Sequence, residues 1–247
     1  MQKTRTKGLR LPVDGCMLVL LLCLMAYQVT GEKLHEWTGI CMTLVVIVHQ
    51  ILNRHWYAAI FKGRYHPYRW ISTLVDLLLL AAMLATALCG MAMSGYAVPF
   101  LYWPGGVYLV RPAHLAMSHW AFLLMGLHIG LHLPLMAAKR KLSAGAKTAL
   151  SLLGTGLGGI GFWLLLLNRL PDYLFFRVPF AFLDYEKAGW LVFLENALIL
   201  SACAFIGAQM AELCLKPKAG EKKRPVLRLA CIAAALLLGF TLKGAMM

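Results

Sequence analysis

Two apolar segments of the sequence each carry a pair of histidines at the same spacing. His35 and His49 are fourteen residues apart, and so are His114 and His128. On an α-helix, fourteen residues make about four turns, short by roughly 40°, and rise about 21 Å. Both imidazoles of a pair therefore leave the same face of a helix, one near each side of a membrane. Two such helices running in the same direction have the spacing needed to hold two b-type haems by axial imidazoles, one above the other.

Equal spacing on parallel spans matches the four histidines in depth. We expect His35 to pair with His114 near the outer face, and His49 to pair with His128 nearer the cytoplasm. Two axial imidazoles leave no open position on haem iron, so such a centre passes single electrons and does not activate ligands. The four histidines are therefore the predicted iron ligands of two bis-histidine haems b.

Other polar residues are candidates to support these haems. His132 lies eighteen residues after His114, which is five full turns, and is the alternative inner ligand or a contact to a haem propionate or a quinone. Arg54 and Arg111 could neutralise inner and outer propionates, with ordinary anchoring at the membrane surface as the alternative. Asp76 lies inside a span, where it could take up a proton during quinone reduction or pair with a loop arginine.

The remaining histidines and buried polar residues fit no ligand pair. His119 is rotated by roughly 140° from the ligand face, so we expect it to point elsewhere. His55 and His66 fall in a basic loop, where exposed side chains are the default. Glu195 and Asn196 lie in the outer half of a later span. The same two alternatives apply to them as to Asp76 in the inner half, namely a role in proton uptake or pairing with another side chain.

Composition indicates the elements that must position these residues. Of the 247 residues 61% are hydrophobic and 14% charged, with a mean hydropathy of +0.72, which is typical of a membrane protein. We predict an all-α, polytopic transmembrane helical bundle of about seven spans with a cytochrome b-like core. Its two parts are a four-helix haem-binding core (1–143) and a three-helix C-terminal region (144–247). The predicted spans are 13–30, 34–53, 70–94, 112–137, 148–168, 188–213 and 227–245.

The basic residues predict the orientation of the chain. Of 24 Lys and Arg residues, eighteen lie on the side of the N-terminus and six on the opposite side. Because cytoplasmic loops carry an excess of basic residues, we expect a cytoplasmic N-terminus, an outer C-terminus and an uncleaved first helix. The net charge of +14 therefore reflects membrane topology, and nucleic acid is not an expected partner. The seven cysteines form no C-x-x-C-H motif, so any haem is expected to be non-covalent.

Glycines and aromatic loops leave alternatives open. Gly126 and Gly130 flank His128 and either allow close helix approach or make room for a flat macrocycle. Loop 95–111 and segment 169–187 are rich in aromatic residues, which fit an interfacial belt, a lid over the outer haem or a docking surface.

Two runs of the sequence resemble signatures of a known family. The run HEWTGICMTLVVIVHQILNRHWY is similar to the H-E-x-x-G…H-x-x-L-N-x-x-W-Y signature of the prokaryotic flavinylation-associated membrane cytochromes b. The run AHLAMSHWAFLLMGLHIGLHL resembles the second signature, with His119 where the family usually has Tyr. The segment DYLFFRVPFAFLDYE resembles a later stretch, so the similarity covers most of residues 10–215. The resemblance implies ligand roles for His35, His49, His114 and His128, and His132 also matches a histidine of the family.

The resemblance implies electron transfer across a prokaryotic cytoplasmic membrane. Its expected partner is an extracytoplasmic flavoprotein with covalently attached FMN, and a quinone pool or membrane donor is expected at the other end. The chain would then be an electron-transfer subunit of an oxidoreductase system in the lipid bilayer. Two alternatives are a haem-free membrane anchor or assembly subunit, and a metal or proton transporter built on His residues and Asp76.

Overall fold

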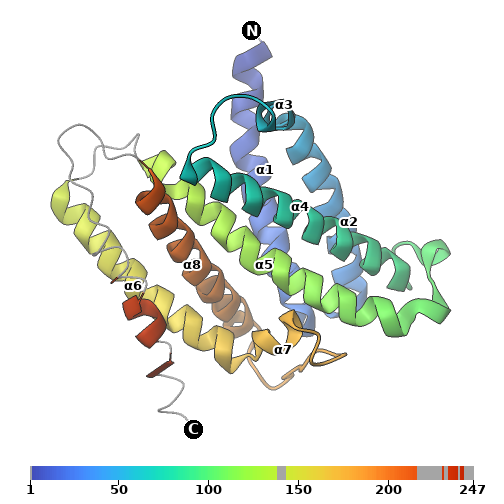
Figure 1. Cartoon of the computed structure of the whole chain (residues 1–247). Coiled ribbons are helices and arrows are strands. Elements are labelled where there is room, and N and C mark those ends of the chain that lie inside the picture. Colours follow the sequence, from blue (N-terminus) through green and yellow to red (C-terminus); the bar gives the residue numbers. More distant parts are fainter. Residues whose placement is uncertain (1, 138–142, 216–229, 231–232, 239, 242–247) are drawn as a thin grey trace. The chain divides into compact units, whose positions relative to one another are not determined.

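The computed structural model describes residues 2–137, 143–215, 230, 233–238 and 240–241, and every regular element among them is a helix (Figure 1). The predicted all-α class is therefore confirmed. The α-helices are α1 (Gln2–Met25), α2 (Tyr27–Leu52), α3 (His55–Ile60), α4 (Pro67–Met93), α5 (Val107–Ala137), α6 (Ala144–Leu167), α7 (Leu170–Leu174) and α8 (Gly189–Cys214). Two short 3₁₀ helices, Pro99–Leu101 and Pro104–Gly106, lie between α4 and α5.

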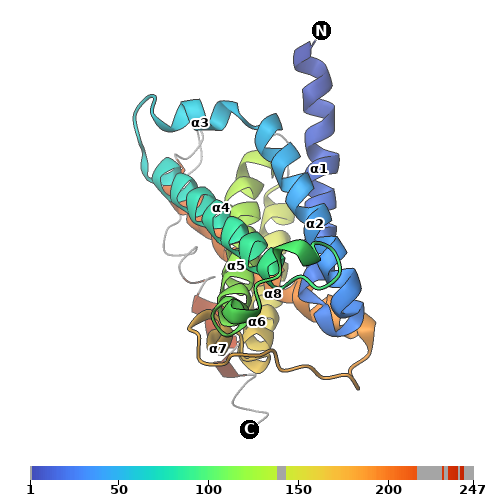
Figure 2. The same ribbon diagram turned by 90° about the vertical axis from the view of Figure 1, so that its right-hand side faces the viewer.

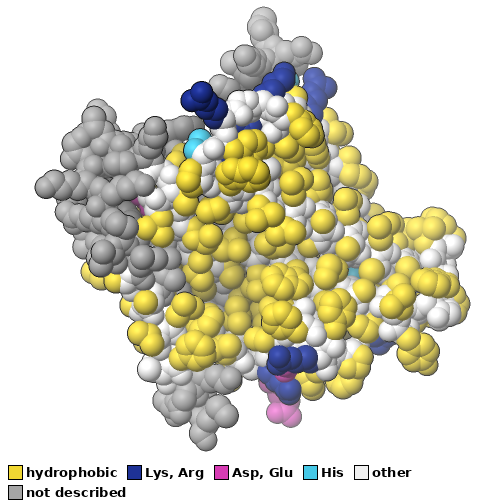
Figure 3. Space-filling view, in the orientation of Figure 1, with side chains coloured by type: hydrophobic (Ala, Val, Ile, Leu, Met, Phe, Trp, Pro, Cys, Tyr) yellow, Lys and Arg dark blue, Asp and Glu magenta, His cyan; other side chains and the backbone are white. Residues whose placement is uncertain are grey.

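Six helices in the described part of the chain are long and apolar enough to cross a membrane. They are α1, α2, α4, α5, α6 and α8, and they correspond to the first six predicted spans. Hydrophobic side chains cover most of the visible face (Figure 3), as expected for helices that meet lipid. The chain is therefore a multispanning membrane protein. The seventh predicted span, 227–245, lies mostly outside the described residues.

The break between the first two spans lies in the predicted gap of residues 31–33. α1 ends at Met25 and α2 begins at Tyr27, but helical hydrogen bonding continues as far as Thr30, whose amide donates to the Ala26 carbonyl. The helix then breaks inside α2, because Gly31 adopts φ 68° and ψ 172°. Glycine reaches this left-handed region without the steric penalty of a side chain. α1 and α2 lie side by side (Figures 1 and 2), and Arg10 Nη2 donates to the Leu52 carbonyl at 3.0 Å.

The chain forms two compact units. The first comprises Met1–Arg64, Leu84–Leu115 and Pro179–Asn196, and the second comprises Tyr65–Met83, Ala116–Val178 and Ala197–Met247. α4 and α5 each contribute one end to each unit, so residues of one helix fall in both. The first unit contains His35, His49 and His114, and the second contains Asp76, His128 and His132.

Small residues bring α5 and α8 together in the second unit. A Cβ atom on Gly126 would lie 2.5 Å from Cys203 Cβ and 2.9 Å from the Leu200 carbonyl oxygen. A Cβ on Gly130 would overlap the carbonyl group of Ala204. Of the two explanations for these glycines, close helix approach is the one that the structure shows.

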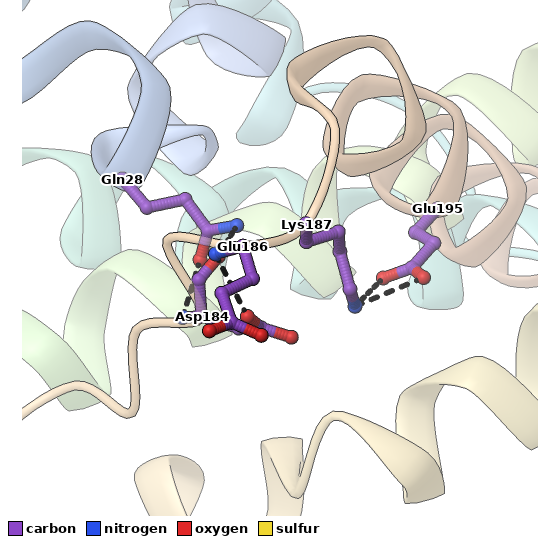
Figure 4. A network of polar contacts seen from close by, with 5 residues as sticks. All are labelled: Gln28, Asp184, Glu186, Lys187 and Glu195. Atoms are coloured by element: carbon purple, nitrogen blue, oxygen red, sulfur yellow. Dashed lines mark hydrogen bonds and ion pairs between the residues drawn. The ribbon is translucent and has the colours of Figure 1, made fainter.

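Polar contacts hold the segment before α8 to the start of α2 (Figure 4). Gln28 Nε2 donates to the Asp184 carbonyl at 3.0 Å, and the Asp184 amide donates to Gln28 Oε1 at 3.2 Å. Lys187 Nζ donates to both carboxylate oxygens of Glu195, at 3.0 and 2.9 Å. The Glu195 carboxylate therefore lies inside a span with a cation beside it.

Candidate functional site

Two predicted ligands, His35 on α2 and His114 on α5, face one another in the first unit. Their ring centroids are 6.1 Å apart, and the ring planes are inclined by 73°. Both helices place the histidine near the start of an apolar span. These two side chains, distant in sequence, therefore form a pair of imidazoles within one compact part of the protein.

Hydrogen bonding fixes the orientation of the His114 ring. Nδ1 of His114 lies 3.0 Å from the Thr86 carbonyl oxygen on α4, and a carbonyl can only accept, so Nδ1 carries the proton. This leaves Nε2 as the nitrogen with a free lone pair. Gly90, one turn beyond Thr86, makes room for the ring, because a Cβ there would lie 3.2 Å from His114 Cε1. A ligating histidine commonly donates its other ring N–H to a backbone carbonyl in this way.

The Nδ1 atom of His35, unlike that of His114, has no well-formed hydrogen bond. This nitrogen is buried, although the Leu24 backbone interacts with the ring. The Tyr27 ring meets His35 edge-on with centroids 5.1 Å apart. A buried polar nitrogen without a good partner is costly, and such atoms mark sites where another group belongs.

Glu36, the residue after His35, anchors the segment that follows α4. Its carboxylate accepts hydrogen bonds from Ser94 Oγ at 2.7 Å and from the amides of Gly95, Tyr96 and Ala97 at 2.9, 2.8 and 2.9 Å. Consecutive backbone N–H groups form a concave site for an anion. The carboxylate therefore ties α2 to the end of α4 directly beside the imidazole pair.

His49 contacts a carboxylate on α1. Its Nδ1 atom lies 2.9 Å from Asp14 Oδ1, and Asn53 Nδ2 approaches its Nε2 atom at 3.4 Å. A carboxylate accepts from Nδ1–H, which leaves Nε2 as the nitrogen with a lone pair. Asn53 also donates to the His49 carbonyl at 2.9 Å, so the end of α2 is held by its own side chains.

In the second unit, His128 contacts the carboxylate of Asp76 on α4. Nδ1 of His128 lies 2.7 Å from Asp76 Oδ1, and both side chains are mostly buried. His132 lies one turn further along α5, with its ring centroid 4.7 Å from that of His128. Ligand atoms of Asp76, His128 and His132 lie within 4.8 Å of one another, so this cluster could also hold a metal ion.

The separation of His35 and His114 fits the dimensions of a bis-imidazole metal site. With metal–nitrogen bonds of about 2.0 Å and a ring nitrogen about 1.1 Å from its centroid, two axial imidazoles have centroids about 6.2 Å apart. The value for His35 and His114 is 6.1 Å. The centroids of His128 and His132, 4.7 Å apart, are too close for the two rings to bind opposite sides of one iron.

The remaining histidines and the two arginines singled out from the sequence are not part of the contacts described above. His119 stacks on Tyr173 of α7 with centroids 4.5 Å apart. His55 and Arg54 are exposed beside the short helix α3, and His66 is exposed and stacks on Tyr68. Arg111 is exposed on the second turn of α5 and interacts electrostatically with Tyr27, whose ring meets that of His35.

Asp14 and Glu36 were not singled out from the sequence. Each is a carboxylate inside a span, which is a signal for a functional residue. Glu36 also stands in the H-E-x-x-G run, but neither fact identifies its partners. The Asp14–His49 and Glu36–Ser94 contacts join residues 35 and 58 positions apart, so local periodicity cannot reveal them.

The fold and these contacts define the class of the protein as a multispanning α-helical membrane protein with paired imidazoles. Comparison with protein-family models, curated proteins and solved structures gives no match to this chain.

Proposed function

We propose that the chain is a transmembrane cytochrome b that holds two non-covalent haems b by bis-histidine ligation. The main support for this proposal is the pair of imidazoles of His35 and His114, whose ring separation suits one iron between them. The Thr86 carbonyl holds the proton of His114 on Nδ1, which directs the Nε2 lone pair toward a metal. The buried Nδ1 of His35 and the space at Gly90 add support.

The second haem rests on the equal spacing of the histidines. His49 and His128 each follow their outer partner by fourteen residues, and each has Nδ1 hydrogen-bonded to a carboxylate. The Asp76 contact fixes the ring of His128, which is the usual companion of metal ligation, and the fourteen-residue spacing favours His128 over His132 as the inner ligand. His132, Arg54 and Arg111 are then candidate contacts to haem propionates.

Bound haem would supply one-electron chemistry. The polypeptide would exclude water from the haem and hold its histidine ligands in a fixed orientation. The apolar spans exclude water from the imidazoles, and the hydrogen bonds to Nδ1 of His49, His114 and His128 keep these three rings in the tautomer that ligation needs. Two axial histidines leave no open coordination position, so the chain carries electrons and does not itself activate a substrate.

Sequence resemblance supports the choice of partners. Electrons would pass between a quinone pool or membrane donor and an extracytoplasmic flavoprotein that carries covalent FMN. The resemblance also supports a prokaryotic cytoplasmic membrane, and the positive-inside pattern supports an N-terminus in the cytoplasm and a C-terminus outside. Aromatic residues exposed between α4 and α5, among them Phe100 and Tyr102, are available for lipid headgroups or for that partner.

A reduced-minus-oxidised spectrum with haem quantified per polypeptide tests the proposal. We expect two haems b in the purified protein and one in each of the variants His114→Ala and His49→Ala. His119→Ala and His55→Ala are matched controls, because one ring stacks on Tyr173 and the other is exposed; both should retain two haems. A haem-free protein after expression with sufficient haem would refute the proposal.

The Asp76–His128–His132 cluster supports a second candidate, a metal or proton transporter. Its three ligand atoms lie close enough to surround one divalent ion. Metal-dependent transport by haem-free protein in vesicles, abolished by Asp76→Asn, would favour this function. A protein with two haems and no metal-dependent transport would exclude it.

A further inference from the structure

Arg10 on α1 is held against the end of α2 within the first unit. Its Nη2 atom donates to the Leu52 carbonyl at 3.0 Å, and its Nε atom is buried without a hydrogen-bond partner. An arginine suits this place, because the last carbonyls of a helix have no partner inside the helix. The half-buried guanidinium makes no other hydrogen bond among the described residues. Since a guanidinium has several N–H donors in a planar fork, Arg10 can also bind an anion.

The contact between Arg10 and Leu52 lies where two apolar spans end. The apolar span of α1 begins at Gly8, and that of α2 ends at Leu52. The phosphates of a bilayer lie just outside its hydrocarbon core, at the depth where apolar spans end. The Arg10 guanidinium is therefore at the level of the lipid headgroups.

The segment after α2, residues 57–64, adds basic and aromatic side chains. Lys62 and Arg64 are exposed, and so are Tyr57 and Phe61, the latter by 89%. Figures 1 and 2 show α3, which contains the first residues of this segment, at the end where α1 begins, and Lys and Arg side chains gather there in Figure 3. Exposed cations beside exposed aromatic rings are typical of segments that lie in the membrane interface and attract anionic lipids.

Few carboxylates balance the positive charge at this end of the unit. Residues 37–64 include no Asp or Glu. Asp14 lies about one turn after Arg10 on α1, but its Oδ1 atom is 2.9 Å from Nδ1 of His49. A phosphate diester would therefore supply both an opposite charge and acceptor oxygens for Arg10.

We propose that Arg10 and segment 57–64 bind the phosphate of an anionic phospholipid. The planar fork of the Arg10 guanidinium matches two phosphate oxygens, and Lys62 adds attraction for the negative headgroup. Depth favours a lipid over a soluble anion or a nucleic acid, because Arg10 lies at the end of the spans and the exposed Phe61 ring suits the boundary with the acyl chains. The bound lipid would join α1 to the segment that follows α2. This site goes beyond the proposed function and involves no haem.

Titration of the purified full chain with lipid in a neutral detergent, with bound lipid counted by native mass spectrometry, tests the inference. Phosphatidylglycerol should bind about tenfold more tightly than phosphatidylcholine with the same acyl chains, because only the former carries a net negative charge. Arg10→Gln should weaken phosphatidylglycerol binding about tenfold through the loss of charge-assisted hydrogen bonds. Lys62→Gln should weaken it about fivefold. Lys33→Gln is the matched control, because Lys33 is also exposed but lies near the start of α2, and should leave the affinity unchanged.

Lys62→Gln keeps the test decisive if Arg10→Gln does not fold, because the Lys62 side chain is exposed. Equal affinities for the two lipids, or a phosphatidylglycerol affinity that neither variant changes, would overturn the inference. An equal loss in Lys33→Gln would also overturn it, since the effect would then follow net charge alone. Displacement of the lipid by millimolar inorganic phosphate would assign the site to a free anion and overturn it as well. A haem-free protein that bound phosphatidylglycerol in this way would support the inference and refute the proposed function.

Discussion

The carboxylate of Glu36 offers a direct test of how the first unit is held together. The substitution Glu36→Gln keeps the size of the side chain and removes its charge. Oε2 accepts from Ser94, Tyr96 and Ala97, while Oε1 accepts from Gly95. A glutamine oxygen could replace Oε2, but its NH₂ group would then face the Gly95 amide, donor against donor.

The magnitude follows from these contacts. Hydrogen bonds to a charged group contribute about 1.5–3 kcal/mol and neutral ones about 0.5–1.5 kcal/mol, so each retained bond weakens by about half. The contacts at Gly95 and Tyr96 are exposed and contribute little, whereas those at Ser94 and Ala97 are partly buried. We therefore expect a loss of about 2 kcal/mol in the free energy of unfolding. For a chain of this size that corresponds to a fall in Tm of about 4–8 °C.

Thermal unfolding in detergent, followed by intrinsic fluorescence, measures this effect. Glu32→Gln is the matched control, because Glu32 lies one turn earlier on α2 and is exposed. It should leave Tm unchanged within about 1 °C, as surface substitutions usually do. Equal Tm values for the two variants would refute the argument that the Glu36 carboxylate holds the end of α4 against α2.

Two further predictions concern packing and charge within the spans. Gly130→Ala should lower the free energy of unfolding by about 1–3 kcal/mol, because its Cβ would overlap the Ala204 carbonyl; Gly145→Ala, with open space around its Cβ, is the control for the same thermal assay, and an unchanged Tm for both would contradict close packing of α5 on α8. Lys187→Met should cost about 3 kcal/mol, since it leaves the Glu195 carboxylate without its cation. The double variant with Glu195→Gln should recover most of that loss in chemical unfolding, and a double variant as unstable as the single one would argue against the ion pair.

Local sequence signals determined the secondary structure well. Apolar runs long enough to span a bilayer predicted six helices in the described residues, since helix length and hydropathy are properties of the segment itself. The gap predicted between the first two spans, residues 31–33, contains the break at Gly31, whereas the end of α1 at Met25 lies inside the predicted first span. The short helices α3 and α7 were not predicted, since so few residues give no periodic pattern.

The sequence by itself also determined the spacing of the four histidines along their own helices. The fourteen-residue spacing follows from helix geometry alone, and it indicated the four histidines before any contact was known. Only the tertiary structure decided what each imidazole touches: His114 the Thr86 carbonyl, His49 the Asp14 carboxylate and His128 the Asp76 carboxylate. The physical reason is that spacing sets the height and rotation of a side chain on its own helix. Its hydrogen-bond partner comes from another helix, whose position depends on packing throughout the unit.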